Sequence, residues 1–286
     1  MNSEPLILPA TDDDLARFGN ARWPDDESRR LWFHLAKFAP NGAWVAKDEG
    51  TPIGIAIAHA LEDEWFLSEL FVEPSFRKQG LGKQLLAHAA ADAVDVGRSA
   101  VVKPSEADGV AFLLQRGVAL QTPLVHISGA LPQEEELARM AVGEYRFSTR
   151  QLEPLGQRLE LGALDREIRG SARPLDHQYF AKHAHGVGFY LRDEFIGYTY
   201  VWPTGRVGPM CAASAAYLVQ LFAFALAALA RVHGASWCTA FVPGSNIRVL
   251  RAATRLGLTV ESASIFASDV PLLELSRYIG FHPLLF

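Results

Sequence analysis

Residues 70–86 read LFVEPSFRKQGLGKQLL, and this stretch decides the fold. An apolar run typical of a β-strand ends at Pro74. A long Ala- and Leu-rich helix is predicted from Gly80 to Val96, with Gly97 as its C-terminal cap. The stretch therefore predicts a tight turn between a strand and a helix.

The composition of this turn indicates a phosphate-binding function. Gly80 and Gly82 have no Cβ atom, so a ligand can approach their backbone closely. The helix N-terminus that follows offers unpaired N–H groups and a positive dipole end, which suit a pyrophosphate. Arg77, Lys78 and Lys83 add positive charge beside it. A solvated basic loop with incidental glycines is the alternative interpretation.

The elements around the turn form an ordered series. Thr11 and the acidic residues after it predict the start of a first helix. The remaining expected elements of the first half are a helix over 26–38, strands over 43–47, 53–59 and 65–72, a strand over 100–102, a helix over 108–116 and a strand over 124–128.

The second half repeats this order with different residues. Its expected elements are a hairpin of strands 189–191 and 196–201, a short strand at 205–209, an Ala-rich helix over 210–230, a strand over 237–242, a helix over 246–256 and a strand over 259–268. One element order in both halves predicts a tandem repeat of a single α/β fold. The expected domains are residues 1–133 and 134–286.

The motif Val72-x-Pro74-x-x-Arg77-x-x-Gly80-x-Gly82 closely resembles the acetyl-CoA pyrophosphate loop of the GNAT N-acetyltransferase superfamily. The resemblance extends over residues 1 to about 130 and includes the element order. The second half resembles the degenerate C-terminal domain of two-domain members, through residues 165–173 and 205–209. It has no Arg-x-x-Gly-x-Gly motif. The resemblance implies two tandem GNAT-like domains of the α/β (α+β) class, each with a mixed central sheet flanked by helices.

The resemblance also implies roles for individual residues. In such enzymes the strand before the loop diverges from its neighbour, and its backbone groups bind the pantetheine arm of CoA. This role falls to Leu70, Phe71 and Val72. The pyrophosphate would be held, beside Arg77 and Lys78, by the backbone N–H groups of Gln79, Gly80, Leu81, Gly82 and Lys83. The implied cosubstrate is acetyl-CoA.

Glu69 is the best match for an acid that helps to deprotonate the acceptor amine, because an ammonium group must lose a proton before it attacks a thioester. A solvated strand residue is the alternative interpretation of Glu69. Glu62, Asp63 and Glu64 could serve instead, although they are also typical of a charged hairpin turn.

The sequence departs from the family at the last helix of each half. Family members often have an Asn that opens this helix and a Tyr near its end that protonates the leaving thiolate. Glu106 and Leu113 stand at these positions in the first half, and Asn246 and Ala253 in the second. Neither half has the tyrosine.

Composition excludes several classes of protein. The 286 residues are 49% hydrophobic and 21% charged, which is typical of a globular protein and excludes wholesale disorder. The net charge of −5 argues against a general nucleic-acid binder. Cys211 and Cys238 show no metal-ligand spacing, so no metal site is expected. Residues 210–230 are uncharged, but their Ala content and polar interruptions favour a buried helix over a membrane span.

The expected function is transfer of the acetyl group of acetyl-CoA to a primary amine, of a small molecule or an amino terminus, by direct attack in a ternary complex. The alternative is a non-catalytic acyl-CoA-binding or regulatory module. Residues 1–133 carry 12 basic and 18 acidic residues, and this surplus favours a cationic acceptor. No secretory signal is recognised, so a cytoplasmic location is expected. The identity of the acceptor and the oligomeric state stay open.

Overall fold

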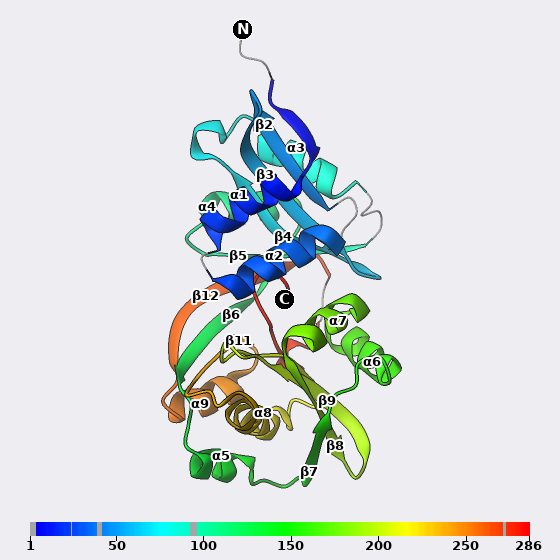
Figure 1. The fold of residues 1–286 in the computed structure, drawn as a ribbon, viewed down its shortest axis with the longest axis vertical. Coiled ribbons are helices and arrows are strands. Elements are labelled where there is room, and N and C mark those ends of the chain that lie inside the picture. The colour runs from blue at the N-terminus through cyan, green and yellow to red at the C-terminus, as the bar shows by residue number, and fades with distance from the viewer. Residues whose placement is uncertain (1–3, 24, 39–41, 92–95, 271–272) are drawn as a thin grey trace. The chain divides into compact units, whose positions relative to one another are not determined.

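The structure is a computed structural model that describes residues 4–23, 25–38, 42–91, 96–270 and 273–286. It divides into two compact units. Unit 1 comprises residues 1–101 with Leu285, and unit 2 comprises residues 102–284 with Phe286 (Figure 1). Each unit combines helices with β-sheet, which confirms the expected mixed α/β class.

Unit 1 is built on a sheet with the strand order β1-β2-β3-β4-β5. Its strands are β1 (Leu6–Pro9), β2 (Ala43–Asp48), β3 (Thr51–Ala60), β4 (Glu64–Val72) and β5 (Gly97–Val102). Its helices are α1 (Asp12–Arg22), α2 (Asp26–Phe38), α3 (Leu81–Ala89) and the short 3₁₀ helix η1 (Pro74–Phe76). The predicted hairpin is therefore confirmed as β2 and β3, and β1 is an addition that the sequence did not indicate.

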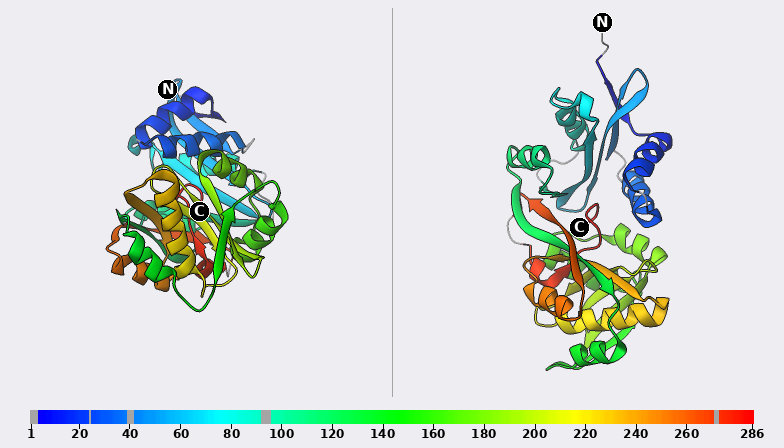
Figure 2. Two further views of the ribbon diagram at one scale, coloured as in Figure 1. Left: turned by 60° about the horizontal axis from the view of Figure 1, so that its bottom comes forward. Right: turned by 90° about the vertical axis from the view of Figure 1, so that its left-hand side faces the viewer.

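The two faces of this sheet are covered by different helices. Phe71 on β4 contacts Phe18 of α1, with ring centroids 5.9 Å apart. The next residue, Val72, points to the opposite face, where α3 lies, because successive side chains of a strand alternate. Figure 2 shows α3 on one side of the sheet and α1 and α2 on the other. Thr11 caps α1 through a reciprocal capping box with Asp14, as its position predicts.

The predicted helix over residues 80–96 is wrong in its length. α3 ends at Ala89, residues 92–95 lie outside the described residues, and Gly97 begins β5 and does not cap the helix. The buried indole of Trp65 donates a hydrogen bond to the Ala89 carbonyl at 3.2 Å. A distant strand residue thus binds one of the carbonyl groups that the helix end leaves open. Pairing of β5 with β4 requires extended backbone from Gly97 onward.

Unit 2 contains a five-stranded sheet and a further group of three paired strands. The five strands lie in the order β13-β10-β9-β8-β7, and the three in the order β12-β6-β11. The strands are β6 (Ala119–Ala130), β7 (Phe147–Gln151), β8 (His185–Leu191), β9 (Glu194–Val201), β10 (Val207–Ala212), β11 (Trp237–Pro243), β12 (Thr259–Ser268) and β13 (Tyr278–Ile279). The helices are α4 (Ala107–Leu114), α5 (Glu134–Ala141), α6 (Arg158–Arg169), α7 (Pro174–His183), α8 (Leu218–His233), α9 (Ile247–Arg255) and the 3₁₀ helix η2 (Leu275–Arg277).

The Ala-rich segment is partly strand, which corrects the expectation of a single helix over residues 210–230. Met210 to Ala212 belong to β10, and α8 begins only at Leu218. Every residue of β10 is buried, so its apolar character reflects a central strand and not the face of a helix. In the described part of the chain, no helix has the length and apolar character needed to cross a membrane.

Strand β6 joins the two halves of the sequence. It follows the elements of the first half, yet it pairs antiparallel with both β11 and β12 of the second half. Ile127 in its centre is fully buried. The compact units therefore divide between Val101 and Val102, earlier than residue 133. The boundary at residue 133 stays a prediction about where the sequence repeat begins.

This pairing predicts that residues 1–133 do not form a stable protein alone. Removing β11 and β12 would leave both edges of the twelve-residue strand β6 without these partners and would expose Ile127. We expect the fragment to aggregate or to show no protected amides at 124–128. Hydrogen exchange on the fragment and on the full chain measures this, and full acetyltransferase activity of the fragment would contradict it.

Candidate functional site

Strands β4 and β5 pair at one end and separate at the other. Their parallel pairing runs from Glu64–Gly97 to Leu67–Ala100. Beyond Leu67, β4 continues to pair with β3 as far as Val72. The side of β4 that faces away from β3 is therefore available for other hydrogen bonds along residues 68–72. Leu70, Phe71 and Val72, the residues expected to bind pantetheine, all lie in this part of β4.

A register shift marks the same place on β4. Leu67 faces Ala58 of β3 and Glu69 faces Ile57, so Ser68 is an extra residue. Such a bulge changes the direction of the side chains beyond it. The structure thus places Glu69 directly after the bulge, next to the point where β4 and β5 separate.

The turn after β4 presents a row of open backbone N–H groups. Within the described residues, no acceptor is bound by the N–H groups of Gln79, Gly80, Leu81 and Gly82. Lys83 differs from the expectation, because its N–H donates to the Gly80 carbonyl at 3.0 Å. The backbone of this turn therefore offers four consecutive donors at the N-terminus of α3, which is an anion-binding arrangement.

The turn contains left-handed backbone at two positions. Lys78 has φ +62° and Gly80, the N-cap of α3, has φ +86°. Glycine adopts this conformation without steric cost, which accounts for Gly80 at the helix start. Gly82 needs no such conformation, and a Cβ there would meet only Val72 Cγ2, at an ordinary 3.7 Å. The fold therefore does not require glycine at position 82.

Cationic side chains surround the turn. Arg77 donates from Nε to the Val72 carbonyl at 2.9 Å, which ties the turn to the end of β4. Lys78 and Lys83 are exposed, and neither forms an ion pair with any described residue. Their charges are available to an anion beside the open N–H groups.

Glu69 has a partner that the sequence did not reveal. Arg22, in the last turn of α1, binds both carboxylate oxygens, with Nη2–Oε1 at 2.9 Å and Nε–Oε2 at 3.2 Å. The Arg22 guanidinium also lies 4.5 Å from the centre of the Phe71 ring. The Glu69 side chain is 10% exposed and that of Arg22 is 28% exposed. No local pattern indicates this contact, because the two residues are 47 positions apart.

The acidic residues of unit 1 are partly neutralised. Asp14 is buried and pairs with Lys47 at 2.9 Å, and Asp12 lies 3.7 Å from Lys37. Asp26 pairs with Arg29. Each of these pairs joins one acid to one base, so the net surplus of negative charge that favours a cationic acceptor is unchanged by them.

The corresponding turn of unit 2 is different. It lies between β10 and α8, and it contains no glycine from Ala213 to Tyr217. Its amides are used within the unit: the N–H of Ala213 donates to the Ile196 carbonyl at 2.7 Å, and that of Ala216 to the Ser214 hydroxyl at 3.2 Å. This turn therefore differs from that of unit 1 in two ways: it lacks the glycines, and three of its N–H groups, those of Ala213, Ala216 and Tyr217, already have partners.

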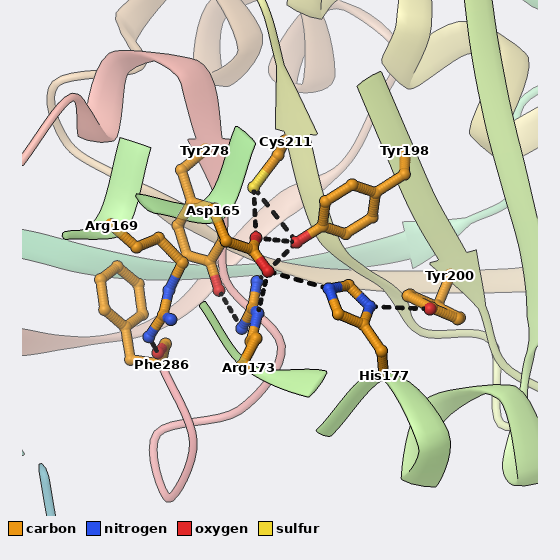
Figure 3. A network of polar contacts seen from close by, with 9 residues as sticks. All are labelled: Asp165, Arg169, Arg173, His177, Tyr198, Tyr200, Cys211, Tyr278 and Phe286. Carbon is orange, nitrogen blue, oxygen red and sulfur yellow. Dashed lines mark hydrogen bonds and ion pairs between the residues drawn. The ribbon is translucent and has the colours of Figure 1, made fainter. Parts of the chain in front are cut away.

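Unit 2 instead contains a buried polar network, shown in Figure 3. Asp165 accepts hydrogen bonds from Tyr198 at 2.5 Å and from His177 at 2.8 Å, and its carboxylate lies 3.6 Å from Arg173 Nε. Burial alone would raise the pKa of Asp165, but the charges of Arg173 and His177 outweigh it and lower that pKa. Burial raises the pKa of the Cys211 thiol to about 12, so this cysteine is no nucleophile at neutral pH.

The polar residues of the stretch 165–173, which the sequence singled out, belong to this buried network. Asp165 and Arg169 are on α6, Arg173 is the N-cap of α7, and all three are buried. Arg169 donates to the backbone oxygen of Phe286. Leu113, at the position that a tyrosine often occupies in the family, is a buried core residue. Among the described residues, no group of three or more His, Cys, Asp and Glu side chains could hold a metal ion.

Comparisons with known proteins bear on the family and the fold of this chain. Residues 8–117 match the "Acetyltransferase (GNAT) family". The structure is similar to that of a protein from Pyrococcus horikoshii assigned to the acetyltransferases, with a TM-score of 0.72 and 14% identity, over 99% of this chain and 96% of that one. No curated protein matches the sequence.

Two further solved structures have a similar fold. One is a GCN5-related N-acetyltransferase from Sphaerobacter thermophilus, with a TM-score of 0.63 and 14% identity over 96% of this chain and 98% of that one. The other is a tandem GNAT protein of the clavulanic acid biosynthesis pathway, with a TM-score of 0.59 and 19% identity over 94% and 99% of the two chains. At these identities the similarity establishes the fold.

Proposed function

We propose that unit 1 binds acetyl-CoA and transfers the acetyl group to a primary amine, since residues 8–117 match the GNAT acetyltransferase family and the fold is similar to that of a tandem GNAT protein. The acceptor is a small molecule or an amino terminus. The observation that carries the proposal is the row of four open N–H groups at Gln79–Gly82, beside diverging strands β4 and β5.

The residues of unit 1 fit acetyl-CoA. The open amides and the charges of Lys78 and Lys83 suit its pyrophosphate. Residues 70–72 lie where β4 has one side available, and they would hold the pantetheine arm by backbone hydrogen bonds. Bound acetyl-CoA supplies an acetyl group activated as a thioester.

Glu69 would act on the acceptor. Its carboxylate takes a proton from the incoming ammonium, directly or through a water molecule, so that the neutral amine attacks. A nitrogen–carbon bond forms, the carbon–sulfur bond breaks and CoA leaves. Because Arg22 engages both oxygens of Glu69, Arg22 orients the carboxylate and must share it with the substrate. Positioning of both substrates supplies much of the remaining rate enhancement.

A non-catalytic acyl-CoA-binding module is the second candidate. Two observations favour it. Arg22 already binds both carboxylate oxygens of Glu69, the proposed base, and Leu113 has no proton to give to the leaving thiolate. Release of free CoA, measured over a panel of primary amines, separates the two functions. Tight acetyl-CoA binding with no release above the rate in buffer would support the module.

Two substitutions at Gly82 test the stability of unit 1 and its affinity for acetyl-CoA separately. Replacing Gly82 by Ala removes backbone freedom and should stabilise unit 1 by up to about 1 kcal/mol, since a Cβ fits there. Gly82→Val should weaken acetyl-CoA binding roughly tenfold or more, because its side chain extends to where the ligand approaches. Calorimetry and thermal unfolding measure the two effects.

Gly80→Ala is the matched control. With φ +86°, an alanine at position 80 is strained by about 1 kcal/mol, so this variant should lose stability. Unchanged acetyl-CoA affinity in Gly82→Val would show that the turn is not the binding site.

Acetyl-CoA should bind with a stoichiometry of one per chain. Unit 1 has the open amides, whereas the amides of Ala213 and Ala216 in unit 2 have partners. Isothermal titration of the full chain measures the number of sites. Two sites of comparable affinity would refute this expectation.

A further inference from the structure

Unit 2 contains a second pair of diverging strands. β10 and β11 have the places in its element order that β4 and β5 have in unit 1, with one long helix between them along the chain. They meet at a parallel bridge between Arg206 and Thr239. Beyond this bridge they do not continue as neighbours, because β13 lies beside β10.

The segment Tyr278–Gly280, here called the closing segment, spans the space between these strands. On one side it pairs antiparallel with β10, with Tyr278 opposite Cys211 and Ile279 opposite Met210. On the other side the Gly280 N–H donates to the Phe241 carbonyl of β11 at 2.7 Å. One short piece of extended chain thus binds the backbone of both diverging strands.

Several contacts hold the closing segment in place. Asn246, which opens α9, donates from its amide to the Tyr278 carbonyl at 2.7 Å. Arg173 of the buried network donates to the Tyr278 hydroxyl at 3.0 Å (Figure 3). A Cβ at Gly208 of β10 would lie 2.3 Å from the Gly280 carbonyl oxygen, so only glycine permits this approach. Tyr278 and Ile279 are fully buried.

We propose that the closing segment permanently fills the opening of unit 2 that corresponds to the acyl-CoA opening of unit 1, and that unit 2 is thereby closed to acyl-CoA by its own chain. The assignment of the opening in unit 1 rests on the proposed function. The physical reason is the backbone: buried N–H and C=O groups along β10 and β11 need partners, and the closing segment supplies them without a ligand.

The closure also gives the buried network a role. Asp165 lies against Arg173, and Arg173 in turn binds Tyr278. The charged groups in the interior of unit 2 therefore anchor a segment of its own chain. In unit 2, the space between β10 and β11 is filled by buried residues of the chain itself, so we infer a structural role for this unit.

Hydrogen exchange on the full chain, with and without saturating acetyl-CoA, tests the proposal. We expect amides 278–281 to exchange slowly in the free protein and at the same rate with acetyl-CoA. Faster exchange at 278–281 on adding acetyl-CoA, or rapid exchange there in the free protein, would overturn it. Protection of amides 79–82 by acetyl-CoA reports separately on unit 1, so failure of the proposed function is distinguishable.

Two variants extend the test to the side chains that hold the closing segment. Asn246→Ala and Tyr278→Phe each delete one hydrogen bond to the closing segment and should raise exchange at Gly280 roughly tenfold, with acetyl-CoA affinity unchanged. Thr254→Ala on the same helix as Asn246 is the control, because its hydroxyl binds only a carbonyl of that helix. Equal exchange at Gly280 in all three variants and the parent protein would contradict the proposed anchoring.

Discussion

Replacing Glu69 by glutamine is expected to lower kcat/KM for acetyl transfer by about 10²- to 10⁴-fold, the usual contribution of a general base. Glutamine keeps the size of the side chain but cannot take a proton from the ammonium group. The affinity for acetyl-CoA should not change, because Glu69 and Phe71 share the α1 face of β4, whereas Val72 faces the turn at Gly82. Steady-state kinetics and calorimetry measure the two quantities.

Glu62→Gln is the matched control for Glu69→Gln. Glu62 is exposed next to the start of β4, and it is one of the three acids considered as alternative bases. We expect its kinetics to equal those of the parent protein. The pH profile of kcat/KM adds a readout that a structural role would not change. In Glu69→Gln, kcat/KM should lose the part of its pH dependence that comes from the general base. A change of less than twofold in kcat/KM would exclude Glu69 as the base.

The substitution Asp165→Asn is expected to destabilise unit 2 by about 3–5 kcal/mol, because it leaves the buried Arg173 without its opposite charge. Asparagine preserves the shape of the side chain, so the loss reports on charge and not on packing. Native-state hydrogen exchange of β8 and β9 measures the opening free energy of this unit.

The pH dependence of the same variant has a defined sign. The pKa of Asp165 is lowered in the folded protein, so its ionisation stabilises unit 2 above the unfolded value of about 3.9 and this contribution is lost as the pH falls below it. Asp165→Asn should lack this acid-dependent loss. Glu167→Gln on the same helix is the control: Glu167 is 61% exposed beside Arg277, and its removal should cost less than about 1 kcal/mol. Equal stabilities of both variants would contradict the prediction.

Much of the candidate site could be predicted from residues that are close in sequence. The glycine at 80, the basic residues at 77 and 78 and the helix start at 81 are local features, and their spacing indicated the anion-binding turn. The hairpin of β2 and β3 and the cap at Thr11 likewise depend on interactions between residues that are close in sequence. What could not be predicted was the N–H of Lys83, which binds the Gly80 carbonyl.

The sequence by itself therefore predicted the turn, most elements of the first half and the resemblance to the GNAT superfamily, because hydrophobic period, capping and glycine spacing act over a few residues. Only the tertiary structure decided how far α3 extends, which residue holds Glu69 and what fills the opening of unit 2. Each of these depends on contacts between distant residues: Trp65 with Ala89, Arg22 with Glu69, and Gly280 with Phe241. A local pattern does not encode such pairings, since burial and hydrogen bonding select them only when the chain is folded.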